Sequence, residues 1–333
     1  MKKILSDMES RFVAATAVMT VAAGFTSYVV TSLMMETALD RKMPGLLKKA
    51  GDRIAGSSDI DRDFIRELDL KADELGKVKT KRVEITAEDG IKLVGHWSPV
   101  PKAKRTIIAM HGWRSSWQKD FGMVAGCWRE NGCNVLFAEQ RGQGESGGDC
   151  MGFGVTERFD CRDWVNWAVS ECGEKLPIYL AGVSMGATTV LMASGLELPD
   201  CVHGIIADCG FTSPDEIWKH IANDNLHLPY GVNRLIANAL YERKVQAGSD
   251  SYSTVDALKN NRIPVLFVHG SDDHFVPVKM TFENYEACRA PKRLLIVPGA
   301  DHGMSYFREP GVYERAAAQF WKDFDGYVPK IRA

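Results

Sequence analysis

A serine stands between two glycines at the point where an apolar run gives way to a helical pattern. Ser184 lies in Gly182–Gly186 (Gly-Val-Ser-Met-Gly), after the apolar run Ile178–Val183 and before the helical pattern of Ala187–Ser194. A serine hydroxyl is a competent nucleophile only when it is exposed, held in place and deprotonated by a neighbour. A sharp strand-to-helix turn exposes and holds it, and the crowding at such a turn requires small residues two positions away on either side. The flanking glycines meet that requirement, so Ser184 is the candidate nucleophile.

An acid and a base follow in two later loops, each placed directly after an apolar run. Asp273 occupies the apex of a His-Gly-x-x-Asp-x-x-Val-Pro segment, with the adjacent Asp272 as the alternative acid. His302 follows in a glycine-flanked loop, from which an imidazole can reach the Ser184 hydroxyl and accept its proton. The order Ser–Asp–His is that of a catalytic triad on an α/β sheet, in which the carboxylate orients the imidazole. We therefore expect Ser184, His302 and Asp273 to form the catalytic group.

Acyl transfer also needs two backbone N–H groups that point at the developing oxyanion. Met185, directly after the nucleophile, supplies one of them. The turn His111-Gly112-Trp113, at the end of the run Thr106–Met110, supplies the other, which we assign to Trp113. His111 is interpreted as a turn-stabilising residue, because it precedes the nucleophile and His302 is the better-placed base.

The elements that must hold these loops form an alternating pattern of strands and helices. Arg82–Glu88 and Ile91–Trp97 flank Asp89-Gly90, which indicates a hairpin. Continuous apolar runs of four to six residues are typical of strands buried on both faces of a parallel sheet. Helical patterns between them predict a doubly wound, mostly parallel α/β sheet with its ligand site at the carboxyl ends of the strands. The predicted strands are Thr106–Met110, Asn134–Ala138, Ile178–Val183, Gly204–Ala207, Pro264–Val268 and Arg293–Val297.

The expected helices include one long interval without a strand. A helix is predicted near Asp61–Leu75 and another at Gln118–Asn131, and Thr156 is expected to cap a third. A closing helix is predicted at Val312–Phe324. The stretch of roughly 45 residues after Phe211 is far longer than a plain crossover needs, so we expect an inserted helical cap at about residues 212–256. In this cap Trp218, His227 and Tyr230 could line a substrate pocket or simply pack the underside of the cap.

The N-terminal region has a different composition from the rest of the chain. Residues 12–35 contain no charged side chain, a run of about 24 residues that is long enough to cross a bilayer as a helix. Three interpretations remain open: an uncleaved membrane anchor, which the length and flanks favour, a cleaved signal peptide, and a packing helix. The expected organisation is a membrane segment at 1–40, a charged connector with one amphipathic helix at 41–80, and a hydrolase-type domain at 81–330. The protein is thus expected to be membrane-anchored, with a slight preference for a cytoplasmic catalytic domain.

Charge and cysteine content exclude several other classes of function. The formal net charge of the 333 residues is −2, and basic residues form no stripe, so no nucleic-acid partner is expected. The eight cysteines have irregular spacings without a Cys-x-x-Cys pair, which argues against a zinc site and favours buried thiols in a reducing compartment. The proposed chemistry needs neither a metal nor an organic cofactor. The sequence leaves the oligomeric state open.

Taken together, these motifs resemble the α/β-hydrolase superfamily over about residues 81–326. The resemblance extends to the segment Arg141–Ser146 (Arg-Gly-Gln-Gly-Glu-Ser), although Glu139 stands where the family usually has Asp. Within the superfamily the chain is similar to bacterial serine hydrolases with an N-terminal membrane segment, a branch related to cinnamoyl-esterase-like and serine-aminopeptidase-like enzymes. The resemblance implies the α/β-hydrolase fold, together with the triad and oxyanion residues assigned above.

The expected activity is hydrolysis of a small-molecule carboxylic ester through an acyl-enzyme on Ser184. A peptidase or aminopeptidase and a thioesterase are alternatives on the same triad. An aminopeptidase would need acidic residues for the substrate ammonium, and Asp215, Glu216 and Asp224 make only a weak cluster. Dehalogenase chemistry is disfavoured because the turn holds Ser rather than Asp. A catalytically inactive binding protein on this fold is the alternative from another class.

Overall fold

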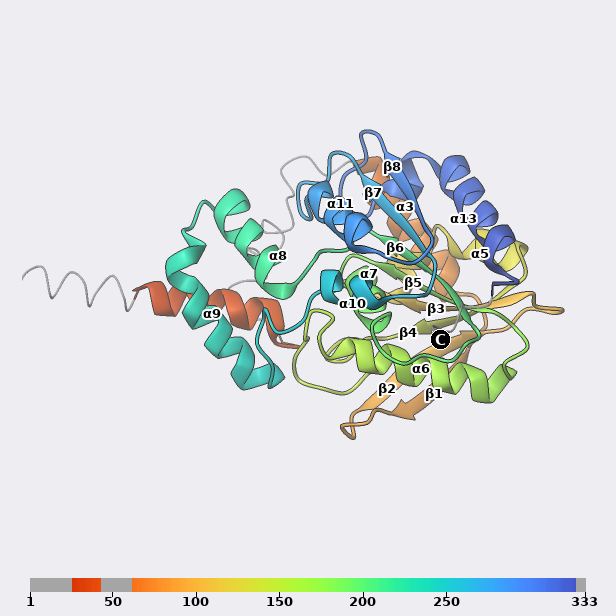
Figure 1. Cartoon of the computed structure of the whole chain (residues 1–333), viewed down its shortest axis with the longest axis horizontal. Helices are drawn as coiled ribbons and strands as arrows, with labels where there is room; N and C mark the ends of the chain where they lie inside the picture. Colours follow the sequence, from red (N-terminus) through yellow and green to blue (C-terminus); the bar gives the residue numbers. More distant parts are fainter. Residues whose placement is uncertain (1–25, 43–61, 328–333) are drawn as a thin grey trace, which may run out of the picture.

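An eight-stranded sheet forms the centre of the computed structural model, which describes residues 26–42 and 62–327 (Figure 1). The strand order is β1-β2-β4-β3-β5-β6-β7-β8. The pairs β1–β2 and β2–β4 are antiparallel, and every neighbouring pair from β4 to β8 is parallel. This confirms the predicted mostly parallel, doubly wound sheet. The strands are β1 Lys81–Thr86, β2 Lys92–Ser98, β3 Arg105–Met110, β4 Cys133–Ala138, β5 Ile178–Val183, β6 Val202–Asp208, β7 Val265–Gly270 and β8 Lys292–Val297.

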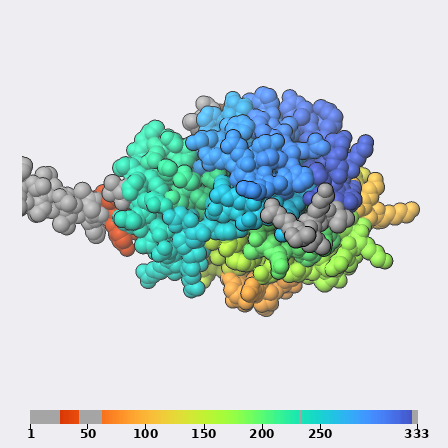
Figure 2. Space-filling model, viewed as in Figure 1, coloured from red at the N-terminus to blue at the C-terminus, as the bar shows by residue number. Residues whose placement is uncertain are grey.

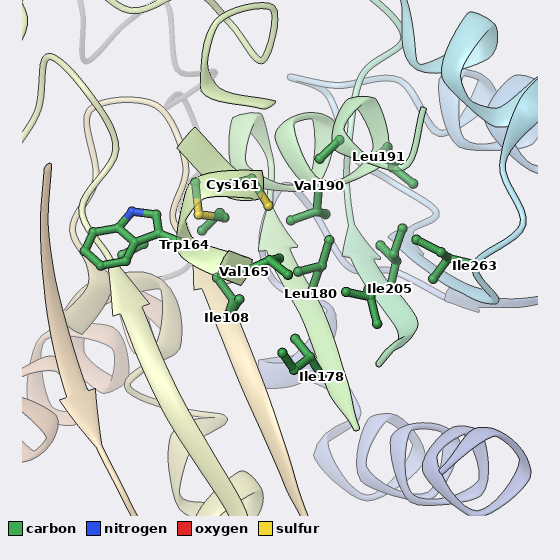
Figure 3. Close-up of a cluster of buried hydrophobic side chains, with 14 of the residues drawn as sticks. Ile108, Cys161, Trp164, Val165, Ile178, Leu180, Val190, Leu191, Ile205 and Ile263 are labelled. Atoms are coloured by element: carbon green, nitrogen blue, oxygen red, sulfur yellow. The ribbon is translucent and has the colours of Figure 1, made fainter. Parts of the chain in front are cut away.

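Successive residues of the central strands point to opposite faces of the sheet, and each face carries its own core. Ile108 and Leu180 pack with α6 (Glu157–Cys172), α7 (Met185–Ala193) and α10 (Thr254–Asn260), as the close-up in Figure 3 shows for α6 residues such as Trp164. Ile107 and Tyr179 pack on the other face, against α4 (Trp117–Phe121), α5 (Ala125–Glu130) and α13 (Pro310–Phe324). The continuous apolar runs are explained by this burial on both sides.

The helices fill the connections between the strands. The N-terminal helix, residues 26–39, begins the described part of the chain. The others are α3 Arg62–Gly76, α4 Trp117–Phe121, α5 Ala125–Glu130, α6 Glu157–Cys172, α7 Met185–Ala193, α8 Pro214–His220, the π-helix η1 Ile221–Asn225, α9 Tyr230–Val245, α10 Thr254–Asn260, α11 Val278–Ala287, α12 Ser305–Arg308 and α13 Pro310–Phe324.

Two local expectations about helices differ from the structure. The predicted helix Gln118–Asn131 is divided into α4 and α5 by a turn at residues 122–124. Gly122, at the start of this turn, lies against the backbone of α3, where a Cβ would come within 2.6 Å of the Lys71 carbonyl carbon. Helix α6 begins after Thr156 as expected, but the Thr156 side chain does not cap it. The Glu157 carboxylate instead accepts the N–H groups of Gly152 and Gly154.

The interval between β6 and β7 contains α8, η1, α9 and α10 and no strand. Helices α8 and α9 lie beside the N-terminal helix at one end of the molecule, at the left of Figure 1. Met35 and Leu39 of the N-terminal helix are buried in one apolar cluster with Trp218 of α8 and Tyr241 of α9. A third core therefore lies outside the sheet, between the cap and the N-terminal helix.

The expectation of a membrane anchor at residues 12–35 is corrected by the structure. Within residues 26–42 and 62–327, no helix is long and apolar enough to cross a membrane. The part of the segment that is described, residues 26–35, belongs to the N-terminal helix, whose apolar face is occupied by contacts with the cap. Residues 12–25 lie outside the described part.

Candidate active site

The turn from β5 to α7 holds Ser184 in a backbone conformation that side chains rarely adopt. Its φ is 55° and its ψ is −120°. A Cβ on Gly186 would come within 1.8 Å of the Met110 carbonyl oxygen, and one on Gly182 within 2.2 Å of the Gly186 carbonyl oxygen. The two glycines are thus required by the close approach of β5, β3 and α7. The Ser184 N–H donates to the Asp208 carbonyl oxygen at 2.9 Å, which fixes the turn to β6.

Three loops that are far apart in the sequence bring a hydroxyl, an imidazole and a carboxylate into line. His302 Nε2 lies 2.9 Å from Ser184 Oγ, and His302 Nδ1 lies 2.7 Å from Asp273 Oδ2. Because a carboxylate can only accept, Nδ1 carries the proton, and Nε2 of the neutral ring is free to accept from the serine hydroxyl. This is the arrangement in which an imidazole can act as a general base.

Asp273 is held from every side. Its Oδ1 accepts the N–H groups of Phe275 and Val276, at 2.9 and 2.8 Å. Its Oδ2, which faces His302, also lies 3.0 Å from Nε2 of the fully buried His269. His269 was part of the sequence motif but was given no role. The spacing His-Gly-x-x-Asp could have indicated the contact between His269 and Asp273, because a residue at a strand end can meet the apex of the following loop across one turn.

Asp273, His302 and Ser184 form a hydrogen-bonded relay, in which burial and neighbouring charges shift the pKa values of Asp273 and His302. Burial disfavours the Asp273 carboxylate, but the neighbouring His302 and His269 outweigh that penalty and hold the pKa of Asp273 well below its ordinary value. Burial lowers the pKa of His302, and the Asp273 carboxylate more than offsets it, so the pKa of His302 lies above its usual 6.5. Asp273 is therefore ionised at neutral pH, and it favours the imidazolium that forms when Ser184 gives up its proton.

Two groups at the end of β6 complete the surroundings of the imidazole. Burial raises the pKa of the Asp208 carboxyl to about 6, and its Oδ1 accepts from Ser305 Oγ at 2.9 Å, which anchors the start of α12 just after His302. The Cys209 Sγ lies within 4.8 Å of ligand atoms of both His302 and Asp273, and burial raises the pKa of this thiol to about 11. Cys209 is one of eight free cysteines, and its sequence position gave no sign of this placement.

Metal binding at this cluster would compete with the relay. Cys209, Asp273 and His302 offer three closely spaced ligand atoms, but Asp273 Oδ2 and both ring nitrogens already take part in the hydrogen bonds described above. A cation on these atoms would have to break the contact with Ser184. The cluster is thus better suited to proton transfer than to holding a resident metal.

The predicted oxyanion donors flank Ser184. A Cβ on Gly112 would touch Ser184 Cβ at 3.3 Å, so the turn that carries Trp113 passes directly over the serine. Met185 is the first residue of α7, where a backbone N–H has no partner inside the helix. Asp120 accepts the Gly112 N–H and the Ser115 hydroxyl, which holds this turn in place.

His111 contributes to the structure of the turn rather than to the relay. It is buried, its Nδ1–H donates to the Gly112 carbonyl oxygen at 2.9 Å, and its Nε2 accepts the Gln140 N–H at 3.2 Å. Burial lowers the pKa of His111, so the ring is neutral and both of its nitrogens are engaged. The structure thus places it as the sequence interpretation expected.

Two cavities meet at Ser184. The first, of about 270 Å³, lies beneath the cap. Among the described residues it is lined by apolar and aromatic side chains, several hydroxyls and one amide, without a charged group. The second, of about 360 Å³, reaches His302 and contains the charged side chains of Arg114, Lys119, Asp120 and Asp208. Ser184, Trp113 and Phe275 border both. The two sides of a bound carbonyl group would therefore meet different surroundings.

The candidate pocket residues of the cap separate into two groups. Trp218 and Tyr230 line the apolar cavity, with 6% and 5% of their surface exposed. His227 is exposed and does not border it. Asp272, the alternative acid, lies on the surface and accepts from Ser271 Oγ rather than approaching His302.

Comparisons with known proteins agree with the observed architecture. A family model described as "Serine aminopeptidase, S33" matches residues 101–257. The uncharacterized protein YqkD of Bacillus subtilis is 31% identical over 189 residues, which cover 57% of this chain and 62% of YqkD. The matched part is thus less than two thirds of that relative. The uncharacterized protein YfhR of Escherichia coli K12 is 27% identical over 229 residues, 66% of this chain and 72% of YfhR.

Among solved structures, the esterase Pf2001 of Pyrococcus furiosus superimposes with a TM-score of 0.62. It is 25% identical, and the match covers 76% of this chain and 95% of the esterase. The two chains thus share a fold over most of their length.

Proposed function

We propose that the chain is a hydrolase of the α/β-hydrolase superfamily and that it cleaves carboxylic esters with Ser184 as the nucleophile. The observation that carries the proposal is the relay of Asp273, His302 and Ser184, with contacts of 2.7 and 2.9 Å, at the edge of an uncharged cavity. A nucleophile, a base and an orienting acid are the three groups that acyl transfer requires.

The proposed reaction has two steps that use the same groups. His302 Nε2 takes the Ser184 proton as Oγ attacks the ester carbonyl carbon, and the N–H groups of Trp113 and Met185 hold the oxyanion. The C–O bond to the leaving group breaks, and His302 returns the proton to the departing alcohol. Water, deprotonated by His302, then attacks the acyl-enzyme, which releases the carboxylic acid and restores the Ser184 hydroxyl.

The charged residues of the cap support an ester rather than an aminoacyl substrate. An aminopeptidase needs a carboxylate to pair with the substrate ammonium. The buried Asp215 instead accepts from the Tyr230 hydroxyl at 2.8 Å and pairs with Arg234 at 3.0 Å. Glu216 pairs with Lys219, and Asp224 with His220. The acidic residues that could have held an ammonium are thus engaged with other partners.

A panel of substrates tests the proposed class. We expect kcat/KM for p-nitrophenyl esters to exceed that for aminoacyl p-nitroanilides by at least about 100-fold, because burying an unpaired ammonium costs about 3 kcal/mol or more. The full chain is assayed with both classes, and Asp215→Asn is the matched control. Faster cleavage of the aminoacyl amides, lost in Asp215→Asn, would establish the peptidase alternative instead.

The pH profile of kcat/KM tests the role of the imidazole. Because the reaction needs neutral His302, and its pKa is raised by Asp273, activity is expected to fall as the pH drops through that raised pKa. The rise of kcat/KM with pH should therefore have its midpoint above 6.5. Initial rates from about pH 5 to about pH 10 measure it. A midpoint below the ordinary value, or a flat profile, would contradict the assignment.

A further inference from the structure

The N-terminal helix forms one wall of the apolar cavity beneath the cap. Eight of the residues that border this cavity come from residues 26–38. Val30, Thr31, Met34 and Met35 recur one helical turn apart, so they share the face of the helix that borders the cavity. The opposite wall is built from Trp218, Ile221 and Tyr230 of the cap. Figure 2 shows the helix, in red, directly beside the cap helices. The cavity is thus closed by a segment that lies before the hydrolase domain in the sequence.

This wall is fastened to the turn that carries the proposed oxyanion donor. Trp113 Nε1–H donates to the Ala38 carbonyl oxygen at 2.8 Å, and the Arg114 guanidinium donates to the carbonyl oxygens of Thr37 and Asp40, at 2.7 and 2.5 Å. The Thr37 and Ala38 carbonyls belong to the last turn of the helix, where they have no partner within it, and Asp40 directly follows that turn. The C-terminal end of the helix is therefore built into the site.

Further contacts hold the helix to the cap and to a neighbouring loop. Asp40 pairs with Lys244 of α9, and Ser27 Oγ donates to the Asn233 side chain. The Met151 N–H donates to the Leu39 carbonyl oxygen at 2.8 Å. Anchors at both ends make the segment a fixed wall of the cavity.

The chemistry of the lining identifies what fits between these walls. Among the described residues, no charged side chain borders the cavity and Asn233 is the one amide that does. Asn233 bonds to Ser27, and the Tyr230 hydroxyl donates to Asp215. A ligand part that enters from Ser184 would thus meet methionine, aliphatic and aromatic side chains and few free polar atoms. Burying methylene groups against such a surface lowers the free energy of binding, whereas burying unpaired polar groups raises it.

We propose that the N-terminal helix completes an acyl-binding cavity, so that the enzyme prefers esters of medium- and long-chain fatty acids. This rests on the proposed function, because the cavity is assigned to the acyl side of an ester held at Ser184. The flexible acyl chain lies between the helix and the cap, and the alcohol part lies in the second, charged cavity on the side of His302.

The test is a series of p-nitrophenyl esters with acetyl, butanoyl, octanoyl and dodecanoyl groups, each used below its aggregation threshold with the full chain. In the wild type, kcat/KM should rise with acyl length by up to about fourfold for each added methylene. Val30→Trp places an indole at the border of the cavity, where Val30 is 38% exposed. Val29→Trp is the matched control, because Val29 lies on the same helix, is 45% exposed and is not among the residues that line the cavity. The dodecanoyl-to-acetyl ratio of kcat/KM is expected to fall at least tenfold in Val30→Trp and to keep its wild-type value in Val29→Trp.

The possible outcomes separate this inference from the function on which it rests. Labelling by a fluorophosphonate and the thermal unfolding temperature establish that each variant is folded and has a reactive serine. Ester hydrolysis that is fastest for the acetyl group and declines with length would overturn the fatty-acyl assignment while leaving the esterase intact. Equal ratios in the two tryptophan variants would overturn the role of the helix as a wall. If the wild type hydrolyses no ester and is not labelled, the proposed function itself fails, and the inference fails with it.

Discussion

Replacing Ser184 with alanine is expected to lower kcat for p-nitrophenyl ester hydrolysis by about 10⁴- to 10⁶-fold, the range found when a triad nucleophile is removed. The substitution deletes the Oγ atom that lies 2.9 Å from His302 Nε2, and within the described part of the chain no other hydroxyl shares that contact. Alanine adds no atoms to the crowded turn, so the fold should persist with the same strained φ of 55°.

The same variant should lose covalent labelling by a fluorophosphonate. Ser253→Ala is the matched control, because it removes a serine that caps α10, where its hydroxyl accepts the Asp256 N–H and donates to the Asp256 carboxylate. That control should label and turn over as the wild type does. Substantial ester hydrolysis by folded Ser184→Ala, measured on protein free of contaminating esterase, would remove Ser184 from the reaction.

Asp273→Asn is expected to lower kcat by about 10⁴-fold, the magnitude typical when a triad carboxylate becomes an amide. The backbone N–H groups of Phe275 and Val276 hold one side-chain oxygen, so the new NH₂ group would take the position of Oδ2 and face His302 Nδ1. A donor at this position favours the tautomer with its proton on Nε2. That tautomer cannot accept the proton of Ser184.

Asp272→Asn is the matched control for this substitution. The two aspartates are neighbours, but Asp272 lies on the surface and bonds to Ser271. Steady-state kinetics on the pair should give nearly wild-type kcat for Asp272→Asn. A comparable loss in both variants, or a larger one in Asp208→Asn, would show that the acid had been assigned to the wrong carboxylate.

The sequence was sufficient for those parts of the site that are determined locally. Ser184 directly follows β5, and Asp273 and His302 lie in the loops that follow β7 and β8. The carboxyl ends of parallel strands in one sheet lie at the same edge. Once the apolar runs are recognised as strands, the three side chains must converge. The need for glycine at positions 182 and 186 could also be predicted from the sequence, because a Cβ at either position would clash with backbone close in sequence or on the adjacent strand β3.

The residues that sequence analysis missed depend on contacts between distant segments. Cys209 directly follows β6 and reaches the imidazole for two reasons: β6 lies beside β7, and the chain turns at Cys209 itself, whose φ is 49°. The close approach of Gly122 to the backbone of α3 likewise joins distant segments, and nothing in Gln118–Asn131 itself signals that contact. A helix that packs under a cap has the same uncharged composition as one that spans a bilayer. The partners of residues 26–35 lie more than 70 residues further along the chain, so hydropathy alone favoured the wrong interpretation.

The bonds from Trp113 and Arg114 to the end of the N-terminal helix link substrate fit to catalytic geometry. The turn that carries the Trp113 N–H is anchored on the Ala38 and Thr37 carbonyls, so displacing the helix also displaces a donor aimed at the reacting carbonyl. Any ligand that stabilises the seated helix correspondingly favours the aligned donor, by thermodynamic reciprocity. Recognition of the remote tail of a substrate and stabilisation of its transition state are thereby coupled through one short segment of backbone.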